Sequence, residues 1–299
     1  MQRMKIVITI IANPKIFPLT KLRAKQLSEE FGSEPPRWLA KEIACELRLE
    51  NELNTVRKAA ATSSFKSMFD IIVQPMHGRR KKLLLTDMDS TIVKNETLDE
   101  LANLTGFGKQ ISAITDRAMK GELDFKTALI ERVKMLQGVP EQALHDTWAK
   151  IELMQGAREL VSTMKANGAT CILISGGFKF FTDRLSELLK FDRNFANTLL
   201  LENGILTGAI NEPILDKNSK RSALFQLIKT YNLDQSETIA VGDGANDLPM
   251  ILSAGMGVAF HAKPILEKKA PACIRFGDLT AVLYIQGYKK ADFKNSNNS

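Results

Sequence analysis

The chain has 299 residues, of which 44% are hydrophobic and 25% are charged, a balance typical of globular proteins that bury an apolar core. Its length suggests about two domains. The three cysteines, Cys45, Cys171 and Cys273, have no metal-ligand or redox spacing, and their odd, low number argues against a disulfide scaffold and favours a reducing compartment.

The first apolar run, residues 6–12, ends at Asn13-Pro14-Lys15. It is too short to span a membrane and lacks a small-residue cleavage pattern, so it predicts a strand. No later segment is long and apolar enough to cross a bilayer. We therefore expect a cytoplasmic protein with no membrane partner.

The net charge of +7 is concentrated in residues 1–80, which hold 14 basic and 8 acidic residues. These charges are scattered, and few aromatic residues lie among them. A solvated basic surface is favoured over a nucleic-acid interface, because charge runs alone are weak evidence. We expect no nucleic-acid partner.

Residues 1–80 predict a small α+β N-terminal domain, with a regulatory or dimerising role as one interpretation. Its expected elements are strands over 6–11 and 69–73 and helices over 20–31 and 37–47, with the helices separated by Gly32 and Pro35-Pro36. The basic cluster over 77–82 is the expected junction with a second domain, residues 81–299.

From residue 83 onward, short apolar runs alternate with amphipathic segments. The runs lie at 83–86, 171–175, 238–243 and 257–260. Because their successive residues are apolar, they suit parallel strands that are buried on both faces. We predict an α/β fold, a Rossmann-like parallel-sheet core with a helical cap inserted over residues 94–155. The polar tail, 295–299, is expected to be unstructured.

Polar residues follow three of these four runs. Asp87 and Asp89 follow the first, Ser175-Gly176-Gly177 the second, and Asp243 the third. Ligands of open α/β sheets bind beyond the carboxyl ends of the strands, so these groups should share one crevice. Such a carboxylate cluster repels itself unless it binds a cation, and oxygen ligands suit Mg²⁺.

Two neighbouring acids in such a crevice fit phosphoryl transfer. A carboxylate can attack phosphorus and form an aspartyl-phosphate, while a second acid protonates the leaving oxygen. Mg²⁺ and a lysine reduce the repulsion between the two anions. A lone DxD pair is more often a turn or cap, GDGAND alone could be a glycine-rich turn, and Ser175 alone an ordinary strand end. Their joint placement favours the functional interpretation.

With these motifs, the chain resembles the haloacid dehalogenase-like phosphatases over residues 81 to about 285. The motifs that carry the resemblance are DMDST (87–91), SGGF (175–178), Lys220 in KNSKRSAL, GDGANDLPM (242–250), and, in the expected cap, NETLDELA (95–102), AMKGELDF (118–125) and ERV (131–133). The resemblance implies that Asp87 is the nucleophile and Asp89 the general acid/base. It implies metal binding by the Asp87 carboxylate, the Asp89 carbonyl and Asp243, with Asp247 in support.

The resemblance also implies the groups that bind the substrate. Ser175, Gly176, Lys220 and Asn246 would hold the phosphate, Glu96 and Arg132 would recognise an ammonium and a carboxylate, and Met119, Phe125 and Gly177 would support the site. The implied reaction is Mg²⁺-dependent hydrolysis of O-phospho-L-serine, the last step of L-serine biosynthesis. Another small phosphate ester, transfer to a second alcohol, a binding role for residues 1–80 and a homodimer stay open.

The residues alone give partial support to the role of Arg132. The segment 124–138 predicts a helix that begins at an Asp124 cap and ends at a glycine. Arg132 lies within its apolar stripe, and a guanidinium that faces inward needs an anion. The alternative is an arginine that extends to solvent from the edge of the stripe. Glu96 alone reads as a favourable charge at a helix N-terminus, Lys220 as a solvent lysine, and Met119 and Phe125 as packing.

Overall fold

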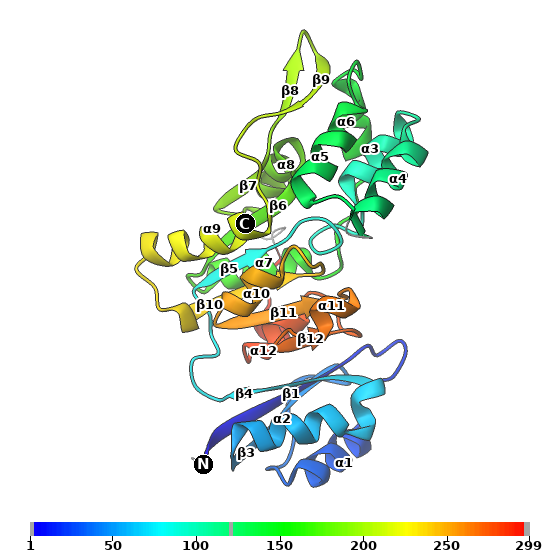
Figure 1. Ribbon diagram of the computed structural model, residues 1–299. Coiled ribbons are helices and arrows are strands. Elements are labelled where there is room, and N and C mark those ends of the chain that lie inside the picture. Colours follow the sequence, from blue (N-terminus) through cyan, green and yellow to red (C-terminus); the bar gives the residue numbers. More distant parts are fainter. Residues whose placement is uncertain (1–2, 120–121, 296–299) are drawn as a thin grey trace.

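The computed structural model describes residues 3–119 and 122–295, so the end of the polar tail, 296–299, lies outside the described residues. An antiparallel sheet with two helices lies at the N-terminal end of the molecule (Figure 1). A parallel sheet flanked by helices follows, and a helical cap with a hairpin lies at the far end. Within the described ranges, no helix is both long and apolar enough to cross a membrane.

The N-terminal unit contains a four-stranded sheet of order β2-β3-β1-β4. Its elements are β1 Met4–Ala12, α1 Lys21–Phe31, β2 Arg37–Ala40, β3 Ala44–Asn51, α2 Leu53–Thr62, the 3-10 turn Ser64–Ser67 and β4 Phe69–Pro75. The central strand β1 pairs with both β3 and β4 in antiparallel register. Thr20 caps α1, because its side chain accepts a hydrogen bond from the Arg23 amide at 3.3 Å.

The helix expected over 37–47 is wrong: this stretch contains β2 and the start of β3, which pair as a hairpin. In β3 the apolar side chains recur with period two. Cys45 and Leu47 pack in the cluster that α1 and α2 cover, whereas Glu46 binds Arg48 at 2.9 Å and contributes nothing to that cluster. This alternation and the pairing with β1 outweigh the helical propensity of the segment.

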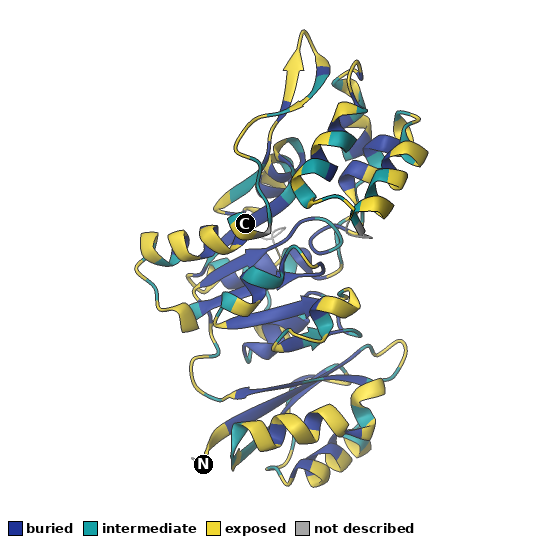
Figure 2. Cartoon of the chain, in the orientation of Figure 1, coloured by how far each residue is buried: buried dark blue, intermediate teal, exposed yellow. Residues whose placement is uncertain are grey.

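The N-terminal sheet is buried on both faces (Figure 2). Its second face joins the main hydrophobic cluster of the parallel-sheet unit through Ile11, Leu39, Ala40, Ala44 and Ile72. Polar contacts fix the same interface. The buried Asp70 carboxylate accepts backbone N–H groups of Arg275, Phe276 and Gly277 at 2.7, 3.1 and 2.9 Å, and Gln74 donates to the Ile285 carbonyl at 2.7 Å.

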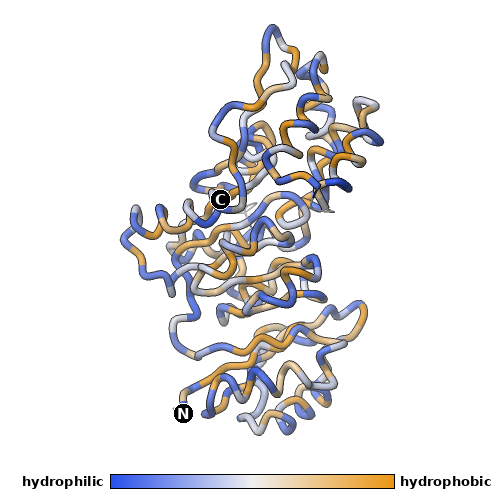
Figure 3. The backbone as a smooth tube through the Cα atoms, in the orientation of Figure 1, coloured by the Kyte–Doolittle hydropathy of each residue, from blue (hydrophilic) through white to orange (hydrophobic). Residues whose placement is uncertain are grey.

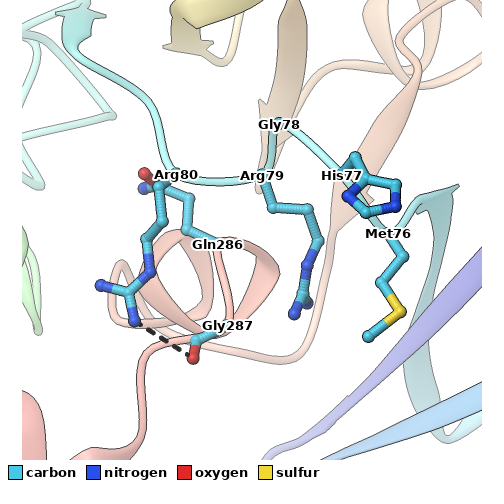
Figure 4. A pocket seen from close by; sticks show the side chains of 7 residues that line it. All are labelled: Met76, His77, Gly78, Arg79, Arg80, Gln286 and Gly287. Atoms are coloured by element: carbon cyan, nitrogen blue, oxygen red, sulfur yellow. Dashed lines mark hydrogen bonds between the residues drawn. The ribbon is translucent and has the colours of Figure 1, made fainter.

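The basic segment between the two sheets is also held in place. Arg79 extends past Gly287 (Figure 4) and pairs with the buried Glu46 at 2.8 Å. Lys81 donates to the carbonyls of Gly78 and Ser236 at 2.7 and 2.6 Å. Much of the basic charge seen in the sequence at this junction therefore has internal partners.

The second sheet is six-stranded and parallel, with the order β12-β11-β10-β5-β6-β7. Its strands are β5 Leu83–Thr86, β6 Thr170–Phe178, β7 Arg193–Asn197, β10 Thr238–Gly242, β11 Met256–Phe260 and β12 Ala272–Ile274. Its helices are α7 Ala157–Ala166, α8 Lys179–Leu189, α9 Lys217–Thr230, α10 Leu248–Ser253, α11 Pro264–Glu267 and α12 Ala281–Ile285, with 3-10 turns at Gln235–Glu237 and Lys290–Asp292.

The α/β fold is as predicted, and the four apolar runs are the four central strands of this sheet. Figure 3 shows hydrophobic residues along both sheets. The edge strands β7 and β12 escape a search for apolar runs, because β7 reads RNFAN and β12 has three residues.

The cap contains α3 Thr97–Leu104, α4 Gly108–Met119, α5 Phe125–Lys134 and α6 Gln142–Trp148. A bridge between Val93 and Leu153 pins the two ends of this inserted segment together. The hairpin of β8 Leu199–Glu202 and β9 Ile205–Ile210 lies beside α5 (Figure 1) and was not expected from the sequence. The Gly138 amide donates to the Leu206 carbonyl at 2.9 Å, so the hairpin supports the turn that follows α5.

Candidate active site

Asp87 follows β5 directly, at the carboxyl edge of the parallel sheet. Its amide continues the pairing with β10 by donating to the Val241 carbonyl at 3.0 Å. Its side chain is only 4% exposed, and Oδ1 lies 2.7 Å from Nζ of Lys220. The Met88 amide donates to the same oxygen at 2.8 Å. Among the described residues no hydrogen bond reaches Oδ2, so that oxygen is available to a ligand.

Lys220 is buried between two carboxylates. It lies in the first turn of α9, where the side chain of Asp216 caps the helix and Ser219 completes a capping box. Nζ contacts Asp87 and Asp247, each at 2.7 Å. Burial alone lowers the pKa of Lys220, but these two carboxylates outweigh that effect and raise it, so the ammonium stays charged. A solvent position for this lysine is excluded.

Asp87, Asp243 and Asp247 form a buried acidic cluster, in which one carboxylate oxygen from each residue lies within 4.8 Å of the other two. Burial, then the neighbouring Asp247, raises the pKa of Asp243 to about 7, and both effects also raise the pKa of Asp87 against the opposing Lys220. One ammonium cannot balance three carboxylates. Such a set of oxygen donors with surplus negative charge fits a hard divalent cation.

The loop from Gly242 to Asp247 brings two of these carboxylates together. Asp247 precedes α10, and its Oδ2 accepts the Gly244 amide at 3.1 Å. A methyl group on Gly242 would lie 2.5 Å from the Asp247 carboxyl carbon, so this close packing requires a glycine. The side chain of Asn246 folds back toward Gly244 and stays partly exposed at the site.

Asp89 lies two residues after Asp87 and is held from two directions. Its Oδ1 accepts the amide of Thr97, the first residue of α3, at 2.8 Å, and its Oδ2 accepts the Ser175 hydroxyl at 3.3 Å. Burial, followed by the negative charge of Glu96, raises the pKa of Asp89 to about 6. A carboxyl group with this pKa can both donate and accept a proton near neutrality.

The segment Ser175-Gly176-Gly177 lies within β6, and its buried Ser175 is hydrogen-bonded to Asp89. The Gly177 amide donates to the Ser175 hydroxyl at 2.8 Å. A methyl group on Gly177 would lie 3.0 Å from Oδ2 of Asp89, and one on Gly176 would lie 3.0 Å from the ring of Phe125. The two glycines therefore let Asp89 from the core and Phe125 from the cap approach the same turn.

The cap places Glu96 and Arg132 near this edge with few contacts of their own. Glu96 precedes α3 as expected, is exposed, and accepts the Ser90 hydroxyl at 2.8 Å. The half-buried Arg132 donates through Nε to the Ala128 carbonyl at 3.2 Å. Burial lowers the pKa of Arg132, while Asp99 and Glu96 oppose this effect. Within the described residues, no ion pair joins its guanidinium to an acid.

The helix expected over 124–138 begins at its predicted cap, but it ends earlier than predicted. The Asp124 side chain caps α5 by accepting the Thr127 amide at 3.0 Å. The helix ends at Lys134, and a turn leads to Gly138, whose φ is +86°. Met119 is the last residue of α4, and its side chain lies outside the part of the chain that the structure describes.

Two residues at the site were not found from the sequence. Lys263 follows β11, the fourth apolar run; its amide donates to the Asp243 carbonyl at 2.9 Å and its ammonium lies 3.9 Å from Oδ2. The search for polar residues after strands would have found it had it been applied to that run. Asn197, 2% exposed, donates to the Gly176 carbonyl at 2.8 Å and accepts the Leu215 amide at 2.7 Å. A lone asparagine gives no sequence signal for this role.

Comparison with known proteins agrees with this geometry. The model of the haloacid dehalogenase-like hydrolase family matches residues 84–252. The chain belongs to this family. It is 43% identical to the phosphoserine phosphatase of Archaeoglobus fulgidus over 221 residues, which are 73% of this chain and 64% of that protein. The chain thus spans less than two thirds of that relative's length.

Two solved structures extend the comparison. A HAD family hydrolase from Salmonella enterica subsp. enterica serovar Typhi superposes with a TM-score of 0.83 at 31% identity, covering 94% of this chain and 98% of the other. A substrate-bound phosphoserine phosphatase complex superposes with a TM-score of 0.65 at 38% identity, covering 69% and 98%. The former similarity includes the N-terminal unit, because it extends over nearly the whole chain.

Proposed function

We propose that this protein is a Mg²⁺-dependent phosphatase that hydrolyses O-phospho-L-serine to L-serine and phosphate, the last step of L-serine biosynthesis. The observation that carries the proposal is the buried Asp87, bound by Lys220 at 2.7 Å and adjoined by Asp243 and Asp247. The similarity to phosphoserine phosphatases supports the choice of substrate.

In the proposed reaction, Asp87 attacks phosphorus through Oδ2, the oxygen that Lys220 and the Met88 amide leave free. A bond forms between this oxygen and phosphorus, and the bond from phosphorus to the seryl oxygen breaks. Asp89 gives its proton to the departing seryl oxygen. Water then attacks the aspartyl-phosphate, Asp89 takes a proton from it, and phosphate leaves while Asp87 is regenerated.

The residues at the carboxyl edge fit a magnesium ion, which when bound would neutralise phosphate charge as phosphorus is attacked. The Asp87 carboxylate, the Asp89 carbonyl and Asp243 would hold it, with Asp247 in support. Lys220 supplies a positive charge that is fixed beside Asp87 and shielded from bulk water, since it is 2% exposed.

The substrate is proposed to lie between this edge and the cap. Ser175, the Gly176 amide, Lys220 and Asn246 would bind the phosphate. Arg132 lacks an acidic partner in the described structure and would take the substrate carboxylate, while Glu96 would take the ammonium. Phe125, against Gly176, and Met119 would exclude water above the reacting group.

Phosphate release from O-phospho-L-serine tests the proposal, measured with Mg²⁺ and with EDTA and beside phosphothreonine and an aryl phosphate. We expect rapid, metal-dependent release that is selective for phosphoserine. Release from the aryl phosphate alone would retain the role of Asp87 and reject the substrate. A second alcohol in the assay separates hydrolysis from phosphoryl transfer, since transfer would yield a new phosphate ester.

We further propose that residues 1–80 form a domain with a regulatory or dimerising role, next to a phosphatase domain of residues 81–299 whose cap spans about 94–155, and that the protein acts in the cytoplasm. The free cysteines, two of them buried, accord with a reducing compartment. Light scattering of the intact protein tests dimerisation directly: a monomer at micromolar concentration would reject it.

A further inference from the structure

A cavity of about 420 Å³ lies between the N-terminal unit and the parallel-sheet unit. One wall comes from α2, β4 and the turn between them, and the other comes from α11, β12 and the loop that joins them. This volume lies in the range of sites for small molecules. The cavity is separate from the acidic cluster, because none of its lining residues belongs to that cluster.

Three cationic side chains line this cavity, and their charge is largely uncompensated. Within the described residues, the Arg57 guanidinium makes no ion pair or hydrogen bond, and the Lys66 ammonium donates only to the Ala61 carbonyl at 3.3 Å. Arg275 binds Glu267 through Nε at 3.1 Å, and among the described residues its two terminal amino groups make no hydrogen bond or ion pair. Guanidinium groups with free N–H donors are suited to a carboxylate or phosphate.

Apart from Glu267 and Cys273, the rest of the lining is apolar. Ile71 and Val73 of β4 face the cavity from one side, and Ala272 of β12 faces it from the other. Val73 and Ala272 are buried and Ile71 is half-buried, so Ile71 offers most of the apolar surface that an occupant could cover. An inorganic anion would leave these contacts unused, whereas a short aliphatic chain would cover them.

The second cavity at this junction differs in its charges. It has a volume of about 330 Å³ and is lined in part by Arg79, Arg80 and Gly287 (Figure 4). Arg79 pairs with Glu46, and Arg80 packs 3.3 Å above the ring of Tyr288 and donates to the Gly287 carbonyl. Its arginines already have partners within the chain, so they offer little to an added anion.

We propose that the 420 Å³ cavity binds a short aliphatic carboxylate, with the anionic group on Arg57, Lys66 and Arg275 and the hydrocarbon against Ile71 and Val73. This site goes beyond the proposed phosphatase activity.

One short helix connects this cavity to the acidic cluster. Glu267, which binds Arg275 at the cavity, is the last residue of α11. Lys263 is the N-cap of the same helix, and its amide binds the Asp243 carbonyl at 2.9 Å. A carboxylate on Arg275 competes with Glu267 for that guanidinium. Occupancy of the cavity therefore acts on the segment that holds Asp243.

Calorimetric titration of the intact protein with isovalerate tests the site. Isovaleramide, which has the same shape without the charge, and inorganic phosphate serve as comparison ligands. We expect saturable binding of isovalerate, at least tenfold weaker binding of the other two, and at least tenfold weaker isovalerate binding by an Arg57→Gln, Lys66→Gln double variant. Both side chains are exposed at the surface of α2 and the following turn, so the variant should fold.

A Lys41→Gln, Lys58→Gln variant is the matched control, since it removes the same charge from exposed positions outside the cavity. Absence of isovalerate binding, equal binding of the amide or phosphate, or equal loss in the control variant would overturn the proposal. No substrate is present, so these outcomes do not depend on phosphatase activity.

A Mg²⁺ titration with and without isovalerate tests the connection through α11. We expect at least a twofold change in Mg²⁺ affinity, and an unchanged affinity would overturn that connection.

Discussion

The carboxyl edge of the parallel sheet and the cap above it hold their polar groups in different ways. At the edge, Asp87 and Asp247 are buried, and a carboxylate oxygen of each lies 2.7 Å from the buried ammonium of Lys220. In the cap, Glu96 is exposed, and the guanidinium of Arg132 donates to a single backbone carbonyl. The groups assigned to bond breaking are thus fixed before substrate arrives. The groups assigned to recognition still have hydrogen-bonding and charged atoms that can contact a substrate.

This difference follows from what each group must do. Charges that stabilise a transition state are most effective when they are already oriented in a site that excludes water. Groups that recognise a small zwitterion must stay unpaired until it binds, and a cap that closes over the substrate can supply their final environment. Substitutions at the edge should therefore change both chemistry and stability, whereas substitutions in the cap should change selectivity alone.

The largest expected effect is at the edge. Asp87→Asn removes the attacking carboxylate while keeping its shape, so we expect turnover of phosphoserine to fall by on the order of 10³-fold or more. Steady-state phosphate release measures this, with circular dichroism to establish that the variant is folded. Substantial activity in a folded Asp87→Asn protein would contradict the assignment of Asp87 as the nucleophile.

Lys220→Met tests the electrostatic role of the edge. The variant leaves Asp87 and Asp247 buried without their shared cation, so we expect a loss of about 3–5 kcal/mol in the free energy of unfolding at neutral pH. Urea unfolding measures it. Lys263→Met is the control, because its side chain is 62% exposed and lies 3.9 Å from Asp243, and we expect a loss below about 1 kcal/mol there. Equal losses in the two variants would contradict the assigned role.

Arg132→Gln tests the cap. Its removal should lower kcat/KM for phosphoserine by about 10–100-fold, equivalent to about 1.4–2.8 kcal/mol, and leave the aryl phosphate nearly unaffected. The free energy of unfolding should change by less than about 0.5 kcal/mol, because the guanidinium has no acidic partner to lose. Arg117→Gln, in α4, is the matched control in the same cap. A parallel loss on both substrates would show that Arg132 does not recognise the carboxylate.

The smallest expected effect is a pH-dependent gain in stability. The pKa of Asp89 is raised from 3.8 to about 6 in the folded protein, so the folded state binds this proton more tightly than the unfolded state does. The contribution of Asp89 to stability falls as pH rises from about 4 to 6 and stays reduced above that range. Asp89→Asn should therefore raise the free energy of unfolding of the metal-free protein more at pH 8 than at pH 4. We expect the two changes to differ by about 1–2 kcal/mol.

Urea unfolding in EDTA at the two pH values measures this difference. Asp116→Asn, an exposed carboxylate of α4, controls for the general loss of charge. An equal pH dependence in the two variants would indicate that Asp89 experiences no unusual environment in the folded state.

Much of the edge could be predicted because its chemistry follows buried parallel strands. Such strands read as apolar runs, and the polar residues that end them must meet at one edge of the sheet. Asp87, Ser175 and Asp243 were placed in this way. Arg132 was noticed because a charge interrupts an apolar stripe. In each case burial leaves a pattern in the sequence itself.

The remaining features depend on contacts between distant segments. The β2–β3 hairpin was expected as a helix because its alternation is visible only once β1 is known to pair with it. The β8–β9 hairpin is largely exposed, so no buried run marks it. Asn197 acts by bonding two backbone groups, Gly176 O and Leu215 N, and its type and spacing give no indication of either partner.

The hydrophobic cluster shared by the two sheets has a consequence for cutting the chain. Ile11, Ala44 and Ile72 of the N-terminal sheet belong to the same cluster as the helices behind the parallel sheet. A break near residue 80 would expose an apolar face on each fragment and leave three backbone N–H groups without the Asp70 carboxylate. The fragments should aggregate or reassociate, so the N-terminal sheet contributes to the solubility of the parallel-sheet unit that follows it.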